Sequence, residues 1–520
     1  MRHQKKYTIR AAITALLVFS IAILLRAPSC YESFWLDELH SAWCIWGSFG
    51  DVGARAKAGH QMPVYFWTLW CWKQLFGGSE FALRMSSVIA VSASCGLLTY
   101  LTATRFKSLA GGFTAGMILS IEQNSLFFGT ELRPYGCILF TTTIAVFCFA
   151  SLLDDTNNND LQSSRKTWLT LLCFVATGFL LQPTSLGTLI VFPIILIAIG
   201  KKPFDPNRKK ATTVSRVAYG LLICVTIGGI ISRTNLLDAW EHRELWSAFG
   251  KSHLIREIAY IWNWTCLWIL PLTALTFLLL SFGCKKAWKQ NQNLLTIIAY
   301  LAMLCILITG IYWVISRNPI IPLWHRRYFI GVLPIFACLA GFSIVFAERI
   351  LNASKQSRSV YQIMIHPALI CFFIIGTLAW NQGLVQTIGN YPTAYTKRGE
   401  RWREAVKYIN RIASDDDAIW VAPGLIEEKL YRQAQRDTLT QNQHDEQIPT
   451  EDYLLYAVYG PYKLAYAAKI WTGQLSQLEP SGRNILLART PASRLDATLK
   501  KSNLVTTFGG LSVIVFDEKP

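Results

Sequence analysis

The stretch that decides the fold is residues 11–43, "AAITALLVFSIAILLRAPSCYESFWLDELHSAW". Its first half is apolar and uncharged, and a helix of about 20 such residues crosses a hydrocarbon layer of ~30 Å. Its second half places the adjacent carboxylates of Asp37 and Glu38 among large apolar and aromatic side chains. We therefore predict a membrane-spanning helix that is followed at once by an acidic motif.

The composition extends this prediction to most of the chain. The 520 residues are 52% hydrophobic and only 16% charged, with a mean hydropathy of +0.31, which is too apolar for an ordinary soluble protein. We predict a polytopic α-helical membrane protein with about eleven spans. They lie at about 9–28, 82–104, 111–128, 135–153, 167–183, 185–200, 214–232, 258–283, 293–315, 328–347 and 361–381.

Two of the apolar stretches need a separate interpretation. Residues 167–200 form one apolar block, but "LQPTSLG" at 181–187 supplies a proline and a glycine, so two short helices that meet in a tight turn are predicted. The stretch 62–76 is shorter and rich in tryptophan, which favours a re-entrant or interfacial helix over a span.

The basic residues predict the orientation, because Lys and Arg collect in cytoplasmic loops. With the N-terminus in the cytoplasm, every inner connection is basic: "RHQKK", "RFK", "SSRK", "KKPFDPNRKK", "KKAWK" and "ERILNASKQSR". The outer set is then residues 27–81, 129–134, a turn near Thr184, 233–257, 316–327 and everything after 381.

The net charge of +18 belongs to the membrane part. Residues 1–381 hold 33 Lys and Arg against 16 Asp and Glu, whereas residues 382–520 hold 17 against 16. This excess suits contact with anionic lipid headgroups. The sequence carries no recognisable nucleic-acid-binding module, so no nucleic-acid partner is expected.

The cysteines and the N-terminus suggest little processing. Most of the 13 cysteines lie in apolar segments and are expected to be small helix residues. Cys30 and Cys44 share the first outer loop and could pair in an oxidising compartment, which spacing alone does not establish. The first apolar segment lacks a small-residue cleavage site and is predicted to remain as an uncleaved helix.

The composition changes after residue 381. Apolar positions at Trp402, Val406 and Ile409 predict one buried helical face, and "AIWVAP", "NILLAR" and "LSVIVFDE" predict strands. We predict a membrane domain at 1–381, with its long outer loop at 27–81, and a small extracytoplasmic α/β domain at 382–520. The second domain lacks phosphate-loop and metal motifs, so we expect it to shape or cap a site made elsewhere.

The chemistry is expected in the outer loops. They contain "LDELH", "AGHQMPVYFW", "GGSEFALR", "GTELRPYG" and "IPLWHRRYF". Each motif has a structural alternative: the acidic pair could stabilise a helix N-terminus, His60 could be an ordinary loop histidine, and the arginines could reach to headgroups. However, positive-inside bias leaves the outer face poor in basic residues. A cluster of arginines on that face favours an anionic ligand.

Carboxylates, a histidine and several arginines at one membrane face suit a particular substrate. A carboxylate can accept a proton from an acceptor hydroxyl, and an arginine fork can bind and neutralise a phosphate that leaves. A lipid-linked phosphosugar meets both requirements, because its tail also needs an apolar groove between helices.

These residues resemble a known family, the GT-C membrane glycosyltransferases of the protein O-mannosyltransferase and aminoarabinose (lipid A) transferase type. The resemblance rests on "WLDELHSAW", "HQMPVYFWTLWCWKQLFGGSEFALRMSS", "ELRPYG" and "HRRYFIGVLP", in this order, and covers most of residues 1–340. It implies a GT-C fold and a polyprenyl-phosphate sugar as donor. The acceptor would be a lipid, a glycan or a protein.

The resemblance also implies roles for individual residues. Asp37 matches the general base or a group that orients the acceptor, with Glu38 in support or at a metal. The residues implied in substrate or phosphate binding are His60, Arg84, Arg133, Tyr135, Arg326, Arg327 and Tyr328. A divalent metal at Asp37, Glu38 and His60 is left open, because these three do not complete a ligand set.

Two departures refine the resemblance. Many relatives have two consecutive prolines after the His or Lys, whereas this chain has "HQMP", so the role of His60 is less secure. The chain also lacks a β-trefoil-like insertion. Together with the small C-terminal domain, this points to a bacterial inner-membrane enzyme that uses undecaprenyl phosphate. The charge types, the predicted topology and the resemblance lead us to expect a single inverting displacement.

Other classes remain to be weighed. A transporter or lipid flippase would be expected to show paired repeats and charges at the membrane midplane, and the sequence shows neither. A receptor or scaffold would leave the acidic pair and the outer arginines unexplained. A lipid-linked oligosaccharide ligase or polymerase would share the substrates and the outer arginines, but would not need "DE" directly after the first helix.

Overall fold

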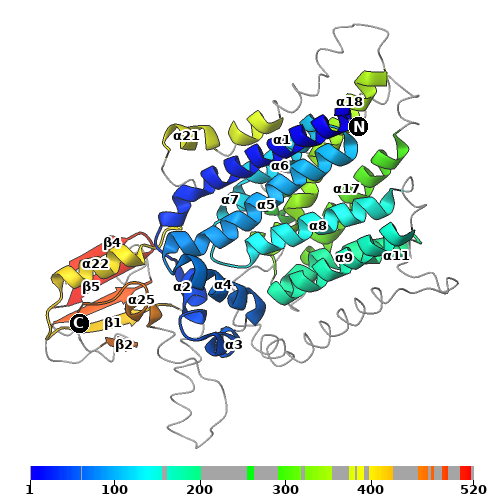
Figure 1. Ribbon diagram of the computed structural model, residues 1–520. Coiled ribbons are helices and arrows are strands. Elements are labelled where there is room, and N and C mark those ends of the chain that lie inside the picture. Colours follow the sequence, from blue (N-terminus) through cyan, green and yellow to red (C-terminus); the bar gives the residue numbers. More distant parts are fainter. Residues whose placement is uncertain are drawn as a thin grey trace, which may run out of the picture. The chain divides into compact units, whose positions relative to one another are not determined.

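A computed structural model shows the fold of the chain (Figure 1). It describes residues 2–59, 61–154, 161–200, 254–262, 291–317, 323–353, 374–380, 383–391, 398–424, 455–465, 470–472, 483–489 and 504–516. The chain forms two compact units. We call Met1–Pro28 with Met85–Tyr395 the helical unit, and Ser29–Arg84 with Thr396–Pro520 the mixed unit.

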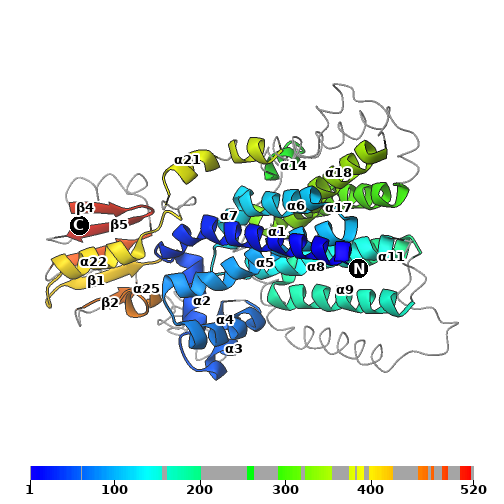
Figure 2. The same cartoon turned by 45° about the horizontal axis from the view of Figure 1, so that its top comes forward.

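The helical unit is built from helices that run beside one another (Figures 1 and 2). Its α-helices are α1 (Arg2–Arg26), α5 (Glu80–Phe106, of which the first turn belongs to the mixed unit), α6 (Leu109–Ile121), α7 (Gln123–Gly129), α8 (Tyr135–Leu153), α9 (Leu161–Leu181), α10 (Leu186–Leu189), α11 (Val191–Ala198), α14 (Glu257–Ile261), α17 (Gln292–Arg317), α18 (Leu333–Ala353) and α21 (Leu384–Gly389). The 3₁₀ helices η3 (Pro183–Ser185) and η5 (Arg326–Val332) also belong to this unit, and η1 (Ala27–Tyr31) follows α1 and continues into the mixed unit.

The described residues contain five helical segments that are long and apolar enough to cross a membrane. They are Gln4–Tyr31, Glu80–Phe106, Tyr135–Leu153, Gln292–Arg317 and Arg326–Arg349. The chain is therefore a multi-pass membrane protein, as its composition predicts. Of the remaining predicted spans, 214–232 and most of 258–283 and 361–381 lie outside the described residues.

Two predictions on individual spans have different outcomes. The block at 167–200 divides around Pro183, as predicted, into α9 and the short helices α10 and α11. The span predicted at 111–128 is wrong as a single helix, because α6 ends at Ile121 and α7 begins at Gln123. Glu122 lies between them with an extended backbone, and its carboxylate accepts the Ser125 amide at 2.7 Å. This acidic N-cap starts a new helix.

Small residues bring three helices close together in the helical unit. A side chain at Gly112 or Gly116 on α6 would collide with the α5 backbone or side chain at Thr99. On another face of α6, Gly111 approaches Gly341 of α18, whose Cβ would meet the Gly111 carbonyl oxygen. Two small residues four positions apart are a common contact between membrane helices, since they let the backbones approach.

The mixed unit combines the long first loop with the C-terminal residues. From the loop come α2 (Leu36–Cys44), α3 (Phe49–Ala58) and α4 (Pro63–Phe76); the C-terminal part supplies α22 (Trp402–Ile412), α25 (Tyr456–Tyr459) and the strands β1 (Ala418–Ala422), β2 (Ile470–Thr472), β3 (Asn484–Ala488), β4 (Leu504–Phe508) and β5 (Leu511–Phe516). The helix and the three strands predicted after residue 381 are all present as α22, β1, β3 and β5.

The five strands form one mixed sheet in the order β2-β1-β3-β5-β4. β1 pairs in parallel with β2 and β3, whereas β5 pairs antiparallel with β3 and β4. Trp420, Leu486, Ile514 and Phe516 form a buried cluster on the sheet. α22 buries Trp402 and Ile409 and contacts β4 and β5 (Figure 2). The loop helices join this unit where α2 contacts α25.

Candidate active site

The acidic motif forms the first turn of helix α2. Trp35 is the extended N-cap residue, so Asp37 and Glu38 lie at the helix N-terminus, where the backbone dipole favours negative charge. Glu38 is fully buried and its Oε2 accepts the Trp35 amide at 3.3 Å, whereas Asp37 is half-buried. The helix-terminal position considered from the sequence is therefore correct. The two adjacent carboxylates differ in exposure, because Glu38 is buried and Asp37 is half-buried.

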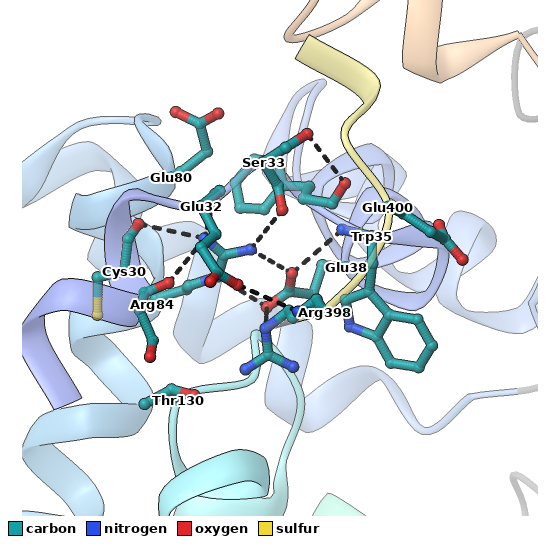
Figure 3. A network of polar contacts seen from close by, with 12 residues as sticks. Cys30, Glu32, Ser33, Trp35, Glu38, Glu80, Arg84, Thr130, Arg398 and Glu400 are labelled. Carbon is teal, nitrogen blue, oxygen red and sulfur yellow. Dashed lines mark hydrogen bonds and ion pairs between the residues drawn. The ribbon is translucent and has the colours of Figure 1, made fainter. Parts of the chain in front are cut away.

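Arg84 holds the buried carboxylate in a two-pronged ion pair. Its Nε donates to Glu38 Oε1 at 2.9 Å and its Nη2 donates to Glu38 Oε2 at 2.5 Å. Both side chains are 0% exposed. Figure 3 shows the Arg84 guanidinium in the middle of this network, and its carbon lies 5.1 Å from the centre of the Phe34 ring. The bidentate geometry fixes both position and direction of the Glu38 carboxylate.

The same guanidinium also organises the loop before α2. Its Nη1 donates to the carbonyl oxygens of Ser29, Cys30 and Glu32, and its Nη2 donates to the Ser33 carbonyl at 3.0 Å. One side chain from the first turn of α5 therefore fixes both the approach to α2 and the acid within it. Sequence reasoning predicted a substrate-binding role for Arg84 and did not pair it with Glu38.

A second arginine reaches this cluster from the C-terminal part of the chain. Arg398 Nε lies 3.8 Å from Glu38 Oε1, and the Arg398 amide donates to Glu32 Oε2 at 3.3 Å (Figure 3). Burial raises the pKa of Glu32, against the opposing influence of the Arg398 amide and of the Arg398 and Arg84 charges. We call Glu32, Asp37, Glu38, Arg84 and Arg398 the loop cluster.

The possible metal site and the possible disulfide have separate outcomes. His60 lies outside the described residues, so the suggested set of Asp37, Glu38 and His60 is not tested. Among the residues that are described, no three His, Cys, Asp or Glu side chains gather as metal ligands. Cys30 and Cys44 are both buried and are not joined to each other.

The other predicted residues lie in the helical unit, at η5 and at the start of α8. η5 contacts both α7 and α8. The Phe128 ring bridges the two motifs, with its centre 5.5 Å from that of Tyr135 and 6.3 Å from that of His325. The structure thus brings together two motifs almost 200 residues apart in sequence, 133–135 and 326–328.

The individual environments in this region differ. Arg133 is 8% and Arg327 is 9% exposed, whereas Arg326 is exposed. The Arg327 guanidinium lies 5.0 Å from the centre of the Tyr328 ring. The backbone amide of Arg327 donates to His325 Nδ1 at 3.3 Å. We call Arg133, Tyr135, Arg326, Arg327 and Tyr328 the arginine cluster. It belongs to the helical unit, and the loop cluster belongs to the mixed unit.

The burial of these arginines tests the alternative that they only reach to headgroups. A snorkelling arginine keeps its guanidinium in the polar region and buries mainly its stem. Arg84 is completely buried, and Arg133 and Arg327 are nearly so. Snorkelling therefore accounts at most for Arg326.

Comparison with known proteins gives a family match for part of the chain. Residues 60–228 match the model of the dolichyl-phosphate-mannose-protein mannosyltransferase family. The match confirms the resemblance predicted from the motifs, and its range includes Arg84, Arg133 and Tyr135 but not Asp37 or Arg327. No curated protein matches the chain.

Solved structures show a further likeness. Two crystal structures of ArnT from Cupriavidus metallidurans align with this chain at 11% sequence identity. Each alignment covers 98% of this chain and 98% of the ArnT chain. The structure bound to undecaprenyl phosphate gives a TM-score of 0.46, and the structure in the apo state gives 0.49.

Proposed function

We propose that the chain is a glycosyltransferase that moves a sugar from a polyprenyl-phosphate donor, undecaprenyl phosphate being the expected carrier, to a hydroxyl or phosphate acceptor. The observation that carries the proposal is the half-buried carboxylate of Asp37 next to a neighbouring carboxylate that two arginines hold. The match of residues 60–228 to a family of lipid-phosphate-sugar transferases supports the same reaction class.

The mechanism is a single inverting displacement. The acceptor oxygen forms a bond with the anomeric carbon while the bond from that carbon to the lipid phosphate oxygen breaks. Asp37 takes the proton of the acceptor hydroxyl as general base. The leaving phosphate gains negative charge, which the guanidinium groups of Arg133 and Arg327 neutralise. Tyr135, Arg326 and Tyr328 are proposed to bind the same phosphate.

Glu38 and Arg84 take a supporting role in this mechanism. Both oxygens of Glu38 accept from Arg84, so this carboxylate is occupied by the protein and is a poor general base. A divalent ion bound at Asp37, Glu38 and His60 would compete with Arg84 for the Glu38 oxygens. The proposed mechanism therefore uses no metal ion in any step.

The proposed topology sets the side of the membrane. We propose eleven spans with a cytoplasmic N-terminus in a bacterial inner membrane, and a soluble extracytoplasmic domain at 382–520. The basic inner loops support this orientation. The donor would then be made at the cytoplasmic face, moved across the membrane and consumed outside.

The test is transfer by the purified wild-type protein in detergent. The donors are polyprenyl monophosphates that carry a labelled sugar and, in parallel, polyprenyl pyrophosphates that carry a labelled oligosaccharide. The acceptor is a detergent extract of cell envelope. The proposal predicts a labelled product together with stoichiometric free polyprenyl phosphate. Transfer only from polyprenyl pyrophosphate oligosaccharides would indicate a ligase or polymerase. In vesicles, donor movement between leaflets without any product would indicate a flippase. Either result overturns the proposal.

A further inference from the structure

The backbone that leads into the acidic motif is held from two sides. Arg84 takes the carbonyl oxygens of residues 29, 30, 32 and 33, as described above. The amides of the following residues point to other acceptors. Phe34 donates to the Tyr462 hydroxyl at 2.7 Å, Trp35 donates to Glu38, and Leu36 donates to Glu400 Oε2 at 2.9 Å. Two of these three acceptors come from the C-terminal part of the chain.

Glu400 occupies a specific place in this arrangement. Leu36 is the first residue of α2, and its amide is one of the helix donors that no internal carbonyl satisfies. Glu400 satisfies it across more than 350 residues of sequence. Trp35, the N-cap residue, offers no side-chain oxygen, so the first turn of α2 lacks the cap that a Ser or Asp at this position would give it. Glu400 supplies a carboxylate acceptor to this turn from the C-terminal part of the chain.

Glu400 is itself rigidly placed. Its Oε2 also accepts the Trp402 indole N–H at 3.0 Å, and its Oε1 accepts Arg489 Nε at 2.6 Å. Its side chain is 9% exposed. Its backbone bridges to Gly509, next to β4 and β5. The sheet and α22 therefore fix the carboxylate, and the carboxylate fixes the first turn of α2.

We propose that Glu400 is a positioning residue for the reaction. It holds the first turn of α2 in place, and this fixes the orientation of the Asp37 side chain, which belongs to the same turn. This rests on the proposed function, because Asp37 acts as the base there. Its neighbours strengthen the inference: the Tyr462 hydroxyl donates to Glu80 at 2.9 Å, and the Arg403 amide donates to Ser33 Oγ at 3.1 Å. The C-terminal part of the chain thus completes the acidic site instead of serving only as a cover.

The experiment compares the full-length wild type with Glu400→Ala, Glu400→Gln and a matched control, Asp415→Asn. Asp415 is an exposed acid in the turn after α22 of the same unit. Hydrogen–deuterium exchange is measured on peptides covering residues 33–44 and, as an internal reference, on β3 and β5. Steady-state transfer from the polyprenyl-phosphate sugar is measured on the same preparations.

For Glu400→Ala we expect faster exchange in 33–44 with unchanged exchange in β3 and β5. We also expect kcat to fall about 10–100-fold, as for other groups that orient a reacting side chain, with the KM for the donor little changed. Glu400→Gln should recover most of the rate, because its amide oxygen can still accept the Leu36 amide. Asp415→Asn should match the wild type in both measurements.

Unchanged exchange in residues 33–44 of Glu400→Ala overturns the inference, whatever the activity. Faster exchange without a loss of kcat overturns the positioning role. So does a loss of kcat that Glu400→Gln does not recover. If the wild type transfers no sugar, the proposed function and the catalytic role fail, while the exchange data still decide whether Glu400 orders the acidic motif.

Discussion

The loop cluster and the arginine cluster use the same residue type in two different ways. In the loop cluster, Arg84 and Arg398 are at most 1% exposed and lie against the Glu38 carboxylate. In the arginine cluster, Arg327 lies over a tyrosine ring and Arg326 is exposed. An arginine that binds several carbonyls and a carboxylate fixes backbone geometry. An arginine that lies over a tyrosine ring, with an exposed arginine as its neighbour, suits a ligand with negative charge.

Removal of the Arg84 side chain should break the loop cluster and give the largest loss of stability. The Arg84→Ala variant leaves Glu38 buried with most of its charge uncompensated, which costs about 3–5 kcal/mol for a buried pair. We expect a fall in Tm on the order of 10 °C in detergent, measured by differential scanning fluorimetry.

The matched control is Arg403→Ala. Arg403 also binds this loop, at Glu80 and at the Tyr31 carbonyl, but its side chain is 31% exposed. A partly exposed pair contributes about 0–1 kcal/mol, so this variant should lose only a few degrees. An equal fall in Tm in the two variants would show that the buried ion pair of Arg84 and Glu38 contributes no more to stability than the partly exposed contacts of Arg403.

Removal of the Arg327 side chain should sharpen the comparison through ligand binding. A charged hydrogen bond to a phosphate is worth about 1.5–3 kcal/mol, so Arg327→Ala should weaken binding of polyprenyl phosphate by about 10–100-fold. Binding is measured by quenching of intrinsic tryptophan fluorescence or by microscale thermophoresis. Its effect on Tm without ligand should be smaller than that of Arg84→Ala.

The control for this experiment is Arg317→Ala. Arg317 is an exposed residue at the end of α17 in the same unit, and it lies over the Trp313 ring, so it shares charge and aromatic contact with Arg327. We expect it to leave the Kd unchanged. If both variants bind equally well, the arginine cluster is not a phosphate site.

The smallest effect concerns the pH dependence of the loop cluster. Burial raises the pKa of Glu32 in the folded protein. The folded state therefore binds this proton more tightly than the unfolded chain, whose Glu pKa is about 4.3. The stability from this group is full below that value and is lost as pH rises through the folded pKa.

We expect Glu32→Gln to remove this part of the decline in Tm above about pH 4, which makes the curve of Tm against pH flatter than that of the wild type. Measurement of Tm at steps between pH 4 and 8 checks this, with Asp415→Asn as the control for a general change in charge. A steeper curve, or one that coincides with the wild type, contradicts the raised pKa.

The sequence predicts the fold well where one local pattern decides it. The span predicted at 135–153 has the same bounds as α8. An uninterrupted apolar run of this length is typical of a single membrane-spanning helix. α22 follows from the spacing of Trp402, Val406 and Ile409. Hydropathy does not reveal the break between α6 and α7 at Glu122, because it is averaged over many residues. The acidic side chain that caps α7 acts at a single position.

The candidate site could be predicted only in part, for a different physical reason. Outer-face motifs predict Asp37, Glu38, Arg84, Arg133 and Arg327 as site residues from residue type and from the expected side of the membrane. The first loop also contacts three residues from the C-terminal part of the chain, Arg398, Glu400 and Tyr462. Each of these partners is about 360 to 430 residues away in sequence. No local pattern carries that information. The charged run "KRGER" at 397–401, just before α22, shows that this segment is polar but does not name its partners.

The most direct test of the account is sugar transfer by the wild type and by Asp37→Asn, side by side, with binding of polyprenyl phosphate measured on both. The account predicts transfer by the wild type, a loss of at least about 100-fold in the variant because a general base contributes 10²–10⁴-fold, and equal lipid binding. Full turnover by Asp37→Asn would remove Asp37 as the base and, with it, the proposed role of the acidic motif.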